Sequence, residues 1–391
     1  MTRTLKRFLK RILKKILKHN PDSIVTYKDL LAINTMLYEL LCLHRWSEVT
    51  ENKGSYTEQS KQALNCLIAY IWAKAIEHAG YPVDFTKFPK LILFRGFTKT
   101  QQCDISENNL NKIFAHGNVS YASFREMIWG EIEKSCSPAF YQHLQVDSNC
   151  LEAFIYKAAT KVATLLELKE IRRFIDEKDF LLKQEQLHED LKEFSGLPCY
   201  DQIMSESYQE IFRNFSKLRN RIRWAKHPNP IPCSVLGHMF DVACFSYLMS
   251  LEVNPGDEEL ATQYFFMGAF HDLPECWTGD MPSPIKDRIK GLRKATEEFE
   301  NDVMEEHVYS HLPQYMVDAI RSVMLEDEGN VQYKVFLKKN DNFSAFVECW
   351  REIDAGSHHD YFEGVVRSDY KKRKSLSPNF QRLLHHLYKD C

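Results

Sequence analysis

The 391-residue chain lacks the sequence features that mark several common protein classes. Its eleven cysteines are scattered singly, with no CxxC pair and no Cys/His spacing of a zinc module. No apolar run approaches the roughly 20 residues of a membrane span. The glycine-rich phosphate loops of kinases and dehydrogenases are also absent. An odd number of cysteines without a disulfide framework is typical of reduced thiols, so we expect a cytoplasmic protein.

The chain also has little excess charge of either sign, and few of the alternating apolar and polar patterns that predict β-strands. The net charge is only −3, which gives no overall attraction to nucleic acid, and we expect no nucleic-acid partner. Apolar residues instead recur at three-to-four spacing along much of the chain, which is the helical period. We therefore predict an all-α protein with helices in seven segments: 27–46, 60–80, 150–173, 206–224, 234–253, 259–273 and 336–356.

The chain is too long for one ordinary hydrophobic core, which indicates two domains, or one domain with a large extension. The polar segment 188–204 holds Gly and Pro and is the best linker candidate. We predict domains over 21–190 and 200–391, preceded by a separate segment over 1–20.

Residues 1–20 carry eight Lys or Arg and no acidic residue, with apolar residues at helical spacing. This pattern predicts a basic amphipathic helix. Three interpretations remain open: peripheral contact with an anionic membrane surface, packing on its own domain with a solvated basic face, and a cleaved targeting segment, which the absence of Ser disfavours.

The two halves of the chain resemble each other over more than 100 residues. Their apolar patterns align in the same order and at similar spacing, which indicates a tandem duplication of one domain rather than a repeat array. The alignment pairs Arg45-Trp46 with Arg223-Trp224, Lys61 with His238, Arg95 with His271, Gly96 with Asp272, Lys99 with Glu275, Asp104 with Asp280, Thr160 with Asp341 and Glu167 with Glu348.

Polar side chains that can bind a metal interrupt the apolar helices of the second half. His238, His271, Asp272 and Asp341 each lie inside or at the end of such a pattern. A charged Asp there is costly unless it is paired or metal-bound, and two His plus two Asp suit a divalent cation. Neighbouring His and Asp point roughly 100° apart on a helix. They can therefore bind one ion only where the helix ends, and Leu273-Pro274 predicts that end.

Glu275 lies one turn beyond His271 on the same side, within reach of a metal-bound water. The alternative for each histidine is a core residue with satisfied hydrogen bonds. Residue chemistry alone leaves the metal site and that alternative open.

The stretch "HDLPECWTGDMPSPIK" resembles the bacterial 5′-deoxynucleotidases of the HD-domain metal-dependent phosphohydrolase superfamily, in which this segment reads HDxxExxTGDxPxPxK. Arg223-Trp224, fifteen residues before His238, and the segment around Asp341 also match. The resemblance covers about 200–356. It departs from the family beside the site, where Gly237 replaces an acidic residue and Met239 a small hydroxyl residue, and it leaves the first half unexplained.

The resemblance implies a role for each matching residue. The metal ligands would be His238, His271, Asp272 and Asp341, holding one divalent ion such as Co²⁺, Mn²⁺ or Mg²⁺. Glu275 would be the general acid/base, and Arg223 would orient the substrate phosphate. Trp224 would pack on the sugar and help to exclude a 2′-hydroxyl; its alternative is a core aromatic. The other substrate contacts would come from His238, Asp272, Asp280, Met281, Pro282 and Ser283, whereas Lys286 is either a phosphate contact or a surface residue.

The predicted function is removal of the 5′-phosphate from deoxynucleoside monophosphates. The alternatives are a phosphodiesterase or triphosphohydrolase of the same superfamily, and a non-catalytic nucleotide sensor. The first half lacks the metal ligands and should be inert. It either binds a nucleotide phosphate through Lys and Arg as an effector or only covers the apolar face of the second half. The apolar helical surfaces of the chain are compatible with a homodimer.

Overall fold

The computed structural model describes residues 23–47, 56–103, 105, 107–117, 120–279, 281, 283–286, 288–326 and 330–389. Within these ranges the chain is helical and its extended pairing is limited to two isolated bridges, His44–Thr57 and Ile222–Ser234. The predicted all-α class is confirmed for this part of the chain. The basic amphipathic helix predicted over residues 1–20 lies outside the described residues.

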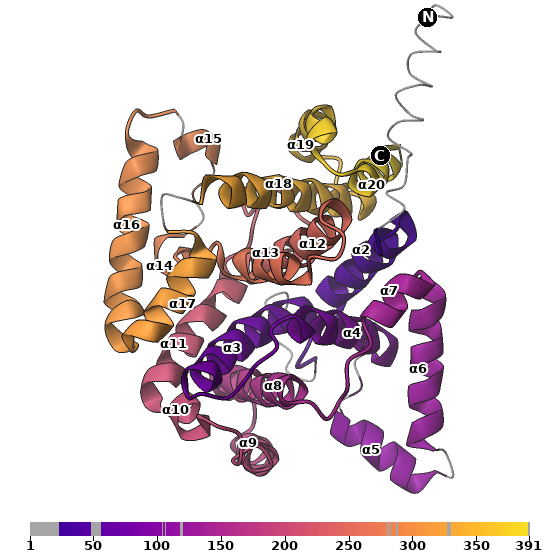
Figure 1. Cartoon of the computed structure of the whole chain (residues 1–391), viewed down its shortest axis with the longest axis vertical. Helices are drawn as coiled ribbons and strands as arrows, with labels where there is room; N and C mark the ends of the chain where they lie inside the picture. The colour runs from indigo at the N-terminus through magenta and orange to yellow at the C-terminus, as the bar shows by residue number, and fades with distance from the viewer. Residues whose placement is uncertain are drawn as a thin grey trace, which may run out of the picture.

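The first half of the chain forms a group of helices that fills most of the lower half of Figure 1, with α2 above it at the right. They are α2 (Tyr27–Cys42), α3 (Glu58–His78), α4 (Lys87–Gln102), α5 (Glu107–His116), α6 (Tyr121–Ser135), α7 (Pro138–His143), α8 (Leu151–Glu170), the 3₁₀ turn η1 (Arg172–Phe174) and α9 (Glu177–Lys192).

The second half contains the longest helix of the described chain, the 24-residue helix Val331–Asp354. Its elements are α10 (Tyr200–Met204), α11 (Glu206–Ser216), η2 (Lys217–Asn220), α12 (Val235–Val253), α13 (Glu258–Phe270), α14 (Glu275–Thr278), α15 (Ser283–Lys286), α16 (Leu292–His307), η3 (Tyr309–His311), α17 (Gln314–Met324), α18 (Val331–Asp354), α19 (Asp360–Lys372), η4 (Arg373–Ser375) and α20 (Pro378–Lys389). Each of the seven predicted helical segments contains a helix.

Two nearly fully buried helices, α3 and α12, lie at the centre of the molecule. They pack against each other, α3 also contacts α8, and α12 also contacts α13 and α18. Gly268 permits the close approach of α13 to α12, because a Cβ atom there would lie 2.7 Å from the Cα atom of Ala243. This contact brings the end of α13 beside the start of α12.

One hydrophobic cluster joins the two halves, since it includes buried residues from Val25 to Leu387. The two ends of the described chain also meet: α2 and α20 lie side by side at the right of Figure 1, and the Asn379 amide donates to the Val25 carbonyl at 3.1 Å. Residues 188–204, predicted as a linker, include the end of α9 and all of α10. The indole of Trp72 donates to the Pro198 carbonyl within this segment at 3.0 Å. The domain division there stays a prediction.

A corner with the same geometry occurs once in each half. Trp46 and Trp224 have left-handed φ angles of 59° and 60°. The preceding Arg45 and Arg223 amides donate to carbonyls across the isolated bridges, at 2.8 and 2.9 Å. Each corner leads into a helix capped by a hydroxyl side chain, Thr57 before α3 and Ser234 before α12. None of the described helices is long and apolar enough to cross a membrane.

Candidate metal centre

Two helices and the turn that follows a third supply the predicted metal ligands. His238 lies in the first turn of α12, where the Ser234 side chain accepts a hydrogen bond from the Gly237 amide at 3.0 Å and caps the helix. Helix α13 ends at Phe270, and His271 and Asp272 occupy the turn before α14. The predicted helix end at the His-Asp pair is therefore confirmed. Asp341 comes from the middle of α18.

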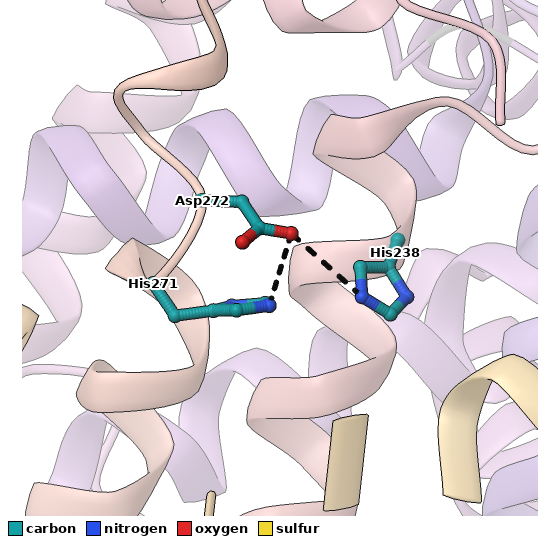
Figure 2. A group of neighbouring side chains, drawn as sticks. All are labelled: His238, His271 and Asp272. Atoms are coloured by element: carbon teal, nitrogen blue, oxygen red, sulfur yellow. Dashed lines mark ion pairs between the residues drawn. The ribbon is translucent and has the colours of Figure 1, made fainter. Parts of the chain in front are cut away.

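His238, His271 and Asp272 offer ligand atoms that all lie within 4.8 Å of one another. The Oδ2 atom of Asp272 is 3.1 Å from His271 Nε2 and 3.9 Å from His238 Nε2, and Figure 2 shows both rings directing a nitrogen toward this carboxylate. Distances of this order leave room for one ion between the three groups.

Asp341 adjoins this cluster on the His238 side. Its Oδ1 atom lies 3.2 Å from His238 Nε2, and its Oδ2 atom accepts from the Lys338 ammonium at 2.5 Å. The four residues predicted as ligands thus come together, although they are spread over more than 100 positions of the sequence.

The histidine nitrogens that face the cluster suit a cation. The Nδ1 atom of His271 lies 2.8 Å from the Gly268 carbonyl, which can only accept, so Nδ1 carries the proton and the Nε2 lone pair is left for a metal. Nδ1 of His238 likewise contacts a carboxylate oxygen, of Glu348, at 2.6 Å. Both buried Nε2 atoms lack a hydrogen bond of acceptable geometry in the described structure. The donor set therefore fits a divalent cation.

The groups of the cluster favour their charged forms, a protonated His238 and ionised Asp272 and Asp341. Burial opposes protonation of His238, but Glu348 and Asp341 outweigh it and raise the pKa of the imidazole to about 10. Burial also opposes ionisation of Asp272, yet the neighbouring His271 lowers the pKa of that carboxyl to about 2. The pKa of Asp341 is held well below its usual range against burial, by His238 and Lys338. A metal ion would take the place of the imidazolium proton.

Glu348 is the functional residue that the sequence analysis missed, since it was aligned with Glu167 and given no role. Its buried carboxylate accepts from Arg223 Nε at 2.9 Å and Trp224 Nε1 at 2.8 Å, besides its contact with His238. Burial opposes its ionisation, but Arg223 and His238 lower the pKa. The available signal was its position seven residues after Asp341, on the same face of α18.

Glu275 and Arg223 lie at the edge of this cluster. Glu275 is buried as the first residue of α14, and its backbone amide donates to the Asp272 carbonyl at 3.1 Å, which ties it to the ligand turn. The guanidinium of Arg223 lies 5.2 Å from the centre of the half-buried Trp224 ring.

The structure describes only some of the remaining predicted substrate contacts. Asp280 and Pro282 lie outside the described residues, Met281 is exposed, and Ser283 begins the short helix α15. The ammonium of Lys286 pairs with Glu300 at 3.2 Å.

Comparisons with known proteins identify the class of this domain. The family described as 5′-deoxynucleotidase YfbR-like matches residues 210–388. The 5′-deoxynucleotidase of Vibrio atlanticus (strain LGP32) is 23% identical over 175 residues, which are 44% of this chain and 89% of the relative. That of Shewanella oneidensis (strain MR-1) is 26% identical over 149 residues, 38% of this chain and 76% of the relative.

The C-terminal part of the chain, residues 210–388, is therefore an HD-type domain of the YfbR-like family, distantly related to bacterial 5′-deoxynucleotidases. This match lies within the predicted domain 200–391 and leaves the first half of the chain uncovered.

Proposed function

We propose that this protein is a metal-dependent phosphohydrolase that removes the 5′-phosphate from deoxynucleoside monophosphates. The observation that carries the proposal is the convergence of two Nε2 atoms without hydrogen bonds and the Asp272 carboxylate in a YfbR-like domain. One divalent ion, such as Co²⁺, Mn²⁺ or Mg²⁺, would be held by His238, His271, Asp272 and Asp341. When bound, it would supply positive charge beside the phosphate and lower the pKa of a water molecule.

The residues of the chain would carry out the rest of the reaction. Glu275 accepts the proton of the attacking water while the oxygen of that water forms a bond to phosphorus. The P–O5′ bond breaks, and Glu275 returns the proton to the departing 5′-oxygen, which yields inorganic phosphate and a deoxynucleoside. Arg223 holds the phosphate oxygens, and Glu348 positions the guanidinium by accepting from Nε.

Substrate selection would fall to Trp224 and the loop after α14. The indole nitrogen of Trp224 is held by Glu348 at 2.8 Å, so the ring has a defined orientation and can pack on the sugar. We assign contacts with the nucleoside to Asp280, which would bind the 3′-hydroxyl, and to the following Met281, Pro282 and Ser283.

We also propose that the first half is a second, metal-free copy of the domain. Its support is a repeated set of contacts, because Arg45 Nε and Trp46 Nε1 donate to Glu167 at 3.0 and 3.1 Å, as Arg223 and Trp224 donate to Glu348. The position that corresponds to His238 holds Lys61, four residues after the cap of α3 as His238 is four after the cap of α12.

The test is phosphate release from deoxy- and ribonucleoside monophosphates with Co²⁺, Mn²⁺ or Mg²⁺. We expect metal-dependent release that favours deoxy substrates, a loss of kcat of about 100-fold or more in Glu275→Gln, and a weaker preference for deoxy substrates in Trp224→Ala. Glu306→Gln is the control, because that carboxylate is exposed on α16. Metal content should be unchanged in Glu275→Gln.

Two outcomes would contradict the proposal. Release from diesters or triphosphates but not from monophosphates would indicate another reaction of the superfamily. Nucleotide binding without hydrolysis of any substrate, with metal demonstrably bound, would indicate a sensor.

A further inference from the structure

A cavity of about 1060 Å³ opens in the first half of the chain, away from the metal centre. It is large enough for a cofactor-sized ligand. Its lining carries seven Lys or Arg side chains and four acidic ones. All but one of the residues aligned with the metal ligands and Glu275 lie in this lining: Lys61 from α3, Arg95 and Lys99 from α4, and Thr160 from α8, with Gly96 as the exception.

Lys61 is the innermost of these cations, with only 5% of its surface exposed. Within the described structure its ammonium makes no hydrogen bond and no ion pair. The two carboxylates that act on it electrostatically are already bound: Glu58 pairs with Arg45 at 2.9 Å, and Glu167 pairs with Arg45 at 2.9 Å and with Arg219 at 3.1 Å. A buried cation without a hydrogen-bonding partner is costly unless an anion joins it.

The pKa of Lys61 is lowered, as expected for a buried ammonium group without a partner. Burial, reinforced by Arg45 and Lys99, lowers the pKa of Lys61 to about 7, although Glu58 and Glu167 act in the opposite direction. An anion in the cavity would favour the protonated form.

Two further cations face the same space. Arg95 is half-buried and has no hydrogen bond or ion pair from its guanidinium within the described residues. Lys99 lies one turn further along the same face of α4. Because these positions carry no histidine or carboxylate, the cavity suits an anion rather than a metal ion. A guanidinium beside ammonium groups is a typical arrangement for phosphate.

The wall of the cavity also holds an aromatic surface. Trp46 lines it and is half-buried, and its indole nitrogen is held by Glu167, so the ring is fixed in position. A fixed ring of this kind can stack on a planar base.

We propose that this cavity is a metal-independent nucleotide-binding site, with the phosphate against Lys61, Arg95 and Lys99 and the base on the side of Trp46. The site is separate from the proposed hydrolytic centre, so its occupancy does not depend on whether that centre is active. It holds its ligand without hydrolysing it, because the positions aligned with the metal ligands carry Lys, Arg, Gly and Thr.

The experiment is isothermal titration calorimetry of the full chain with deoxyadenosine monophosphate, in a phosphate-free buffer containing EDTA. We expect binding that weakens about tenfold or more in both Arg95→Gln and Lys61→Met. It should persist in Arg223→Ala, which removes a phosphate contact of the other site. Lys371→Ala, an exposed cation on α19, is the matched control.

Binding at pH 8 should be accompanied by proton uptake, seen as a binding enthalpy that varies with the ionisation enthalpy of the buffer. Lys61→Met should abolish this uptake.

Three results would overturn the proposal: no binding with EDTA present, binding lost in Arg223→Ala but kept in Arg95→Gln, or equal affinity for inorganic phosphate, which would exclude a nucleotide-specific site. Circular dichroism checks that each variant folds. If Lys61→Met does not fold, the half-buried Arg95 carries the test alone.

Discussion

At the scale of single residues, the candidate centre depends on a carboxylate that touches no proposed reactant. Glu348 fixes the tautomer of His238 and the orientation of both Arg223 and Trp224. Replacing residues that orient metal ligands in this way typically lowers metal affinity by roughly 10- to 100-fold.

We predict that Glu348→Gln lowers metal affinity about 10- to 100-fold, because the amide cannot replace the carboxylate toward three donors at once. Metal titration of the chelator-treated protein measures the effect. Glu352→Gln is the matched control, one turn further along α18. There the side chain accepts from the Ile231 amide at 3.4 Å, and burial raises its pKa to about 7, so the carboxyl is already half protonated near neutral pH. Equal losses in the two variants would contradict the role assigned to Glu348.

Lys61 gives a prediction for the pH dependence of stability. Its folded-state pKa of about 7 lies below that of an unfolded lysine, near 10.4. The folded state therefore opposes protonation. The resulting destabilisation is complete below pH 7 and is relieved as the pH rises toward the unfolded value.

Lys61→Met should accordingly be more stable than the wild type near pH 7. The difference in unfolding free energy should shrink by up to about 1.4 kcal/mol per pH unit between pH 7 and 10. Urea unfolding in phosphate-free buffers measures it. Lys371→Met, at an exposed position, should show a difference independent of pH; a constant difference for Lys61→Met as well would mean that Lys61 titrates normally.

At the scale of helices, the close contact of α12 and α13 sets the distance between the two histidines. The contact depends on Gly268, which lies three residues before His271 and faces the backbone of Ala243. Backbone atoms cannot move aside as a flexible side chain can.

We predict that Gly268→Ala destabilises the fold by about 1–3 kcal/mol through overpacking and weakens metal binding by separating α13 from α12. Gly130→Ala is the control, because a Cβ atom at Gly130 in α6 would meet nothing within 4 Å. That variant should be slightly more stable, by about 0.5–1 kcal/mol, since Ala favours the helix. Unchanged metal affinity in Gly268→Ala would show that the contact does not set the site.

At the scale of the whole molecule, the halves share both apolar and polar contacts. The Gln59 amide donates to the buried Asp241 carboxylate at 2.6 Å, and the same carboxylate pairs with Arg351 at 2.6 Å. The hydroxyls of Ser60 and Ser234 lie 3.0 Å apart, which joins the first turns of α3 and α12. These buried contacts link the residues that begin the two central helices.

We therefore predict a single cooperative thermal transition for the full chain, in spite of its two related halves. A divalent metal at 100 times its dissociation constant should stabilise the whole molecule by about 2.7 kcal/mol, and Asp272→Asn should abolish this shift. Calorimetry with and without metal measures it. Two transitions, of which metal moves only one, would show that the halves unfold independently.

The local elements were largely predictable from the sequence. The apolar period over 234–253 predicted a helix that the structure places at Val235–Val253, and Leu273-Pro274 indicated the helix end that occurs at Phe270. Segment 188–204 was predicted as a linker, yet it contains α10 and packs on Trp72. Its Gly and Pro indicated a break in the chain but not how the short helix beyond it would be buried.

The sequence by itself determined the helical class, the positions of the long helices and, through the HD-type motif, the set of candidate ligands. The first two properties depend on neighbouring residues, so the helical period and the helix-ending residues are sufficient to predict them. The ligand set rests on the resemblance of the motif to the family. Only the tertiary structure decided that Glu348 holds His238 from 110 positions away, and that Lys61, Arg95 and Lys99 face one cavity. Such contacts depend on how helices pack, and packing is set by side-chain shapes brought together from distant parts of the chain.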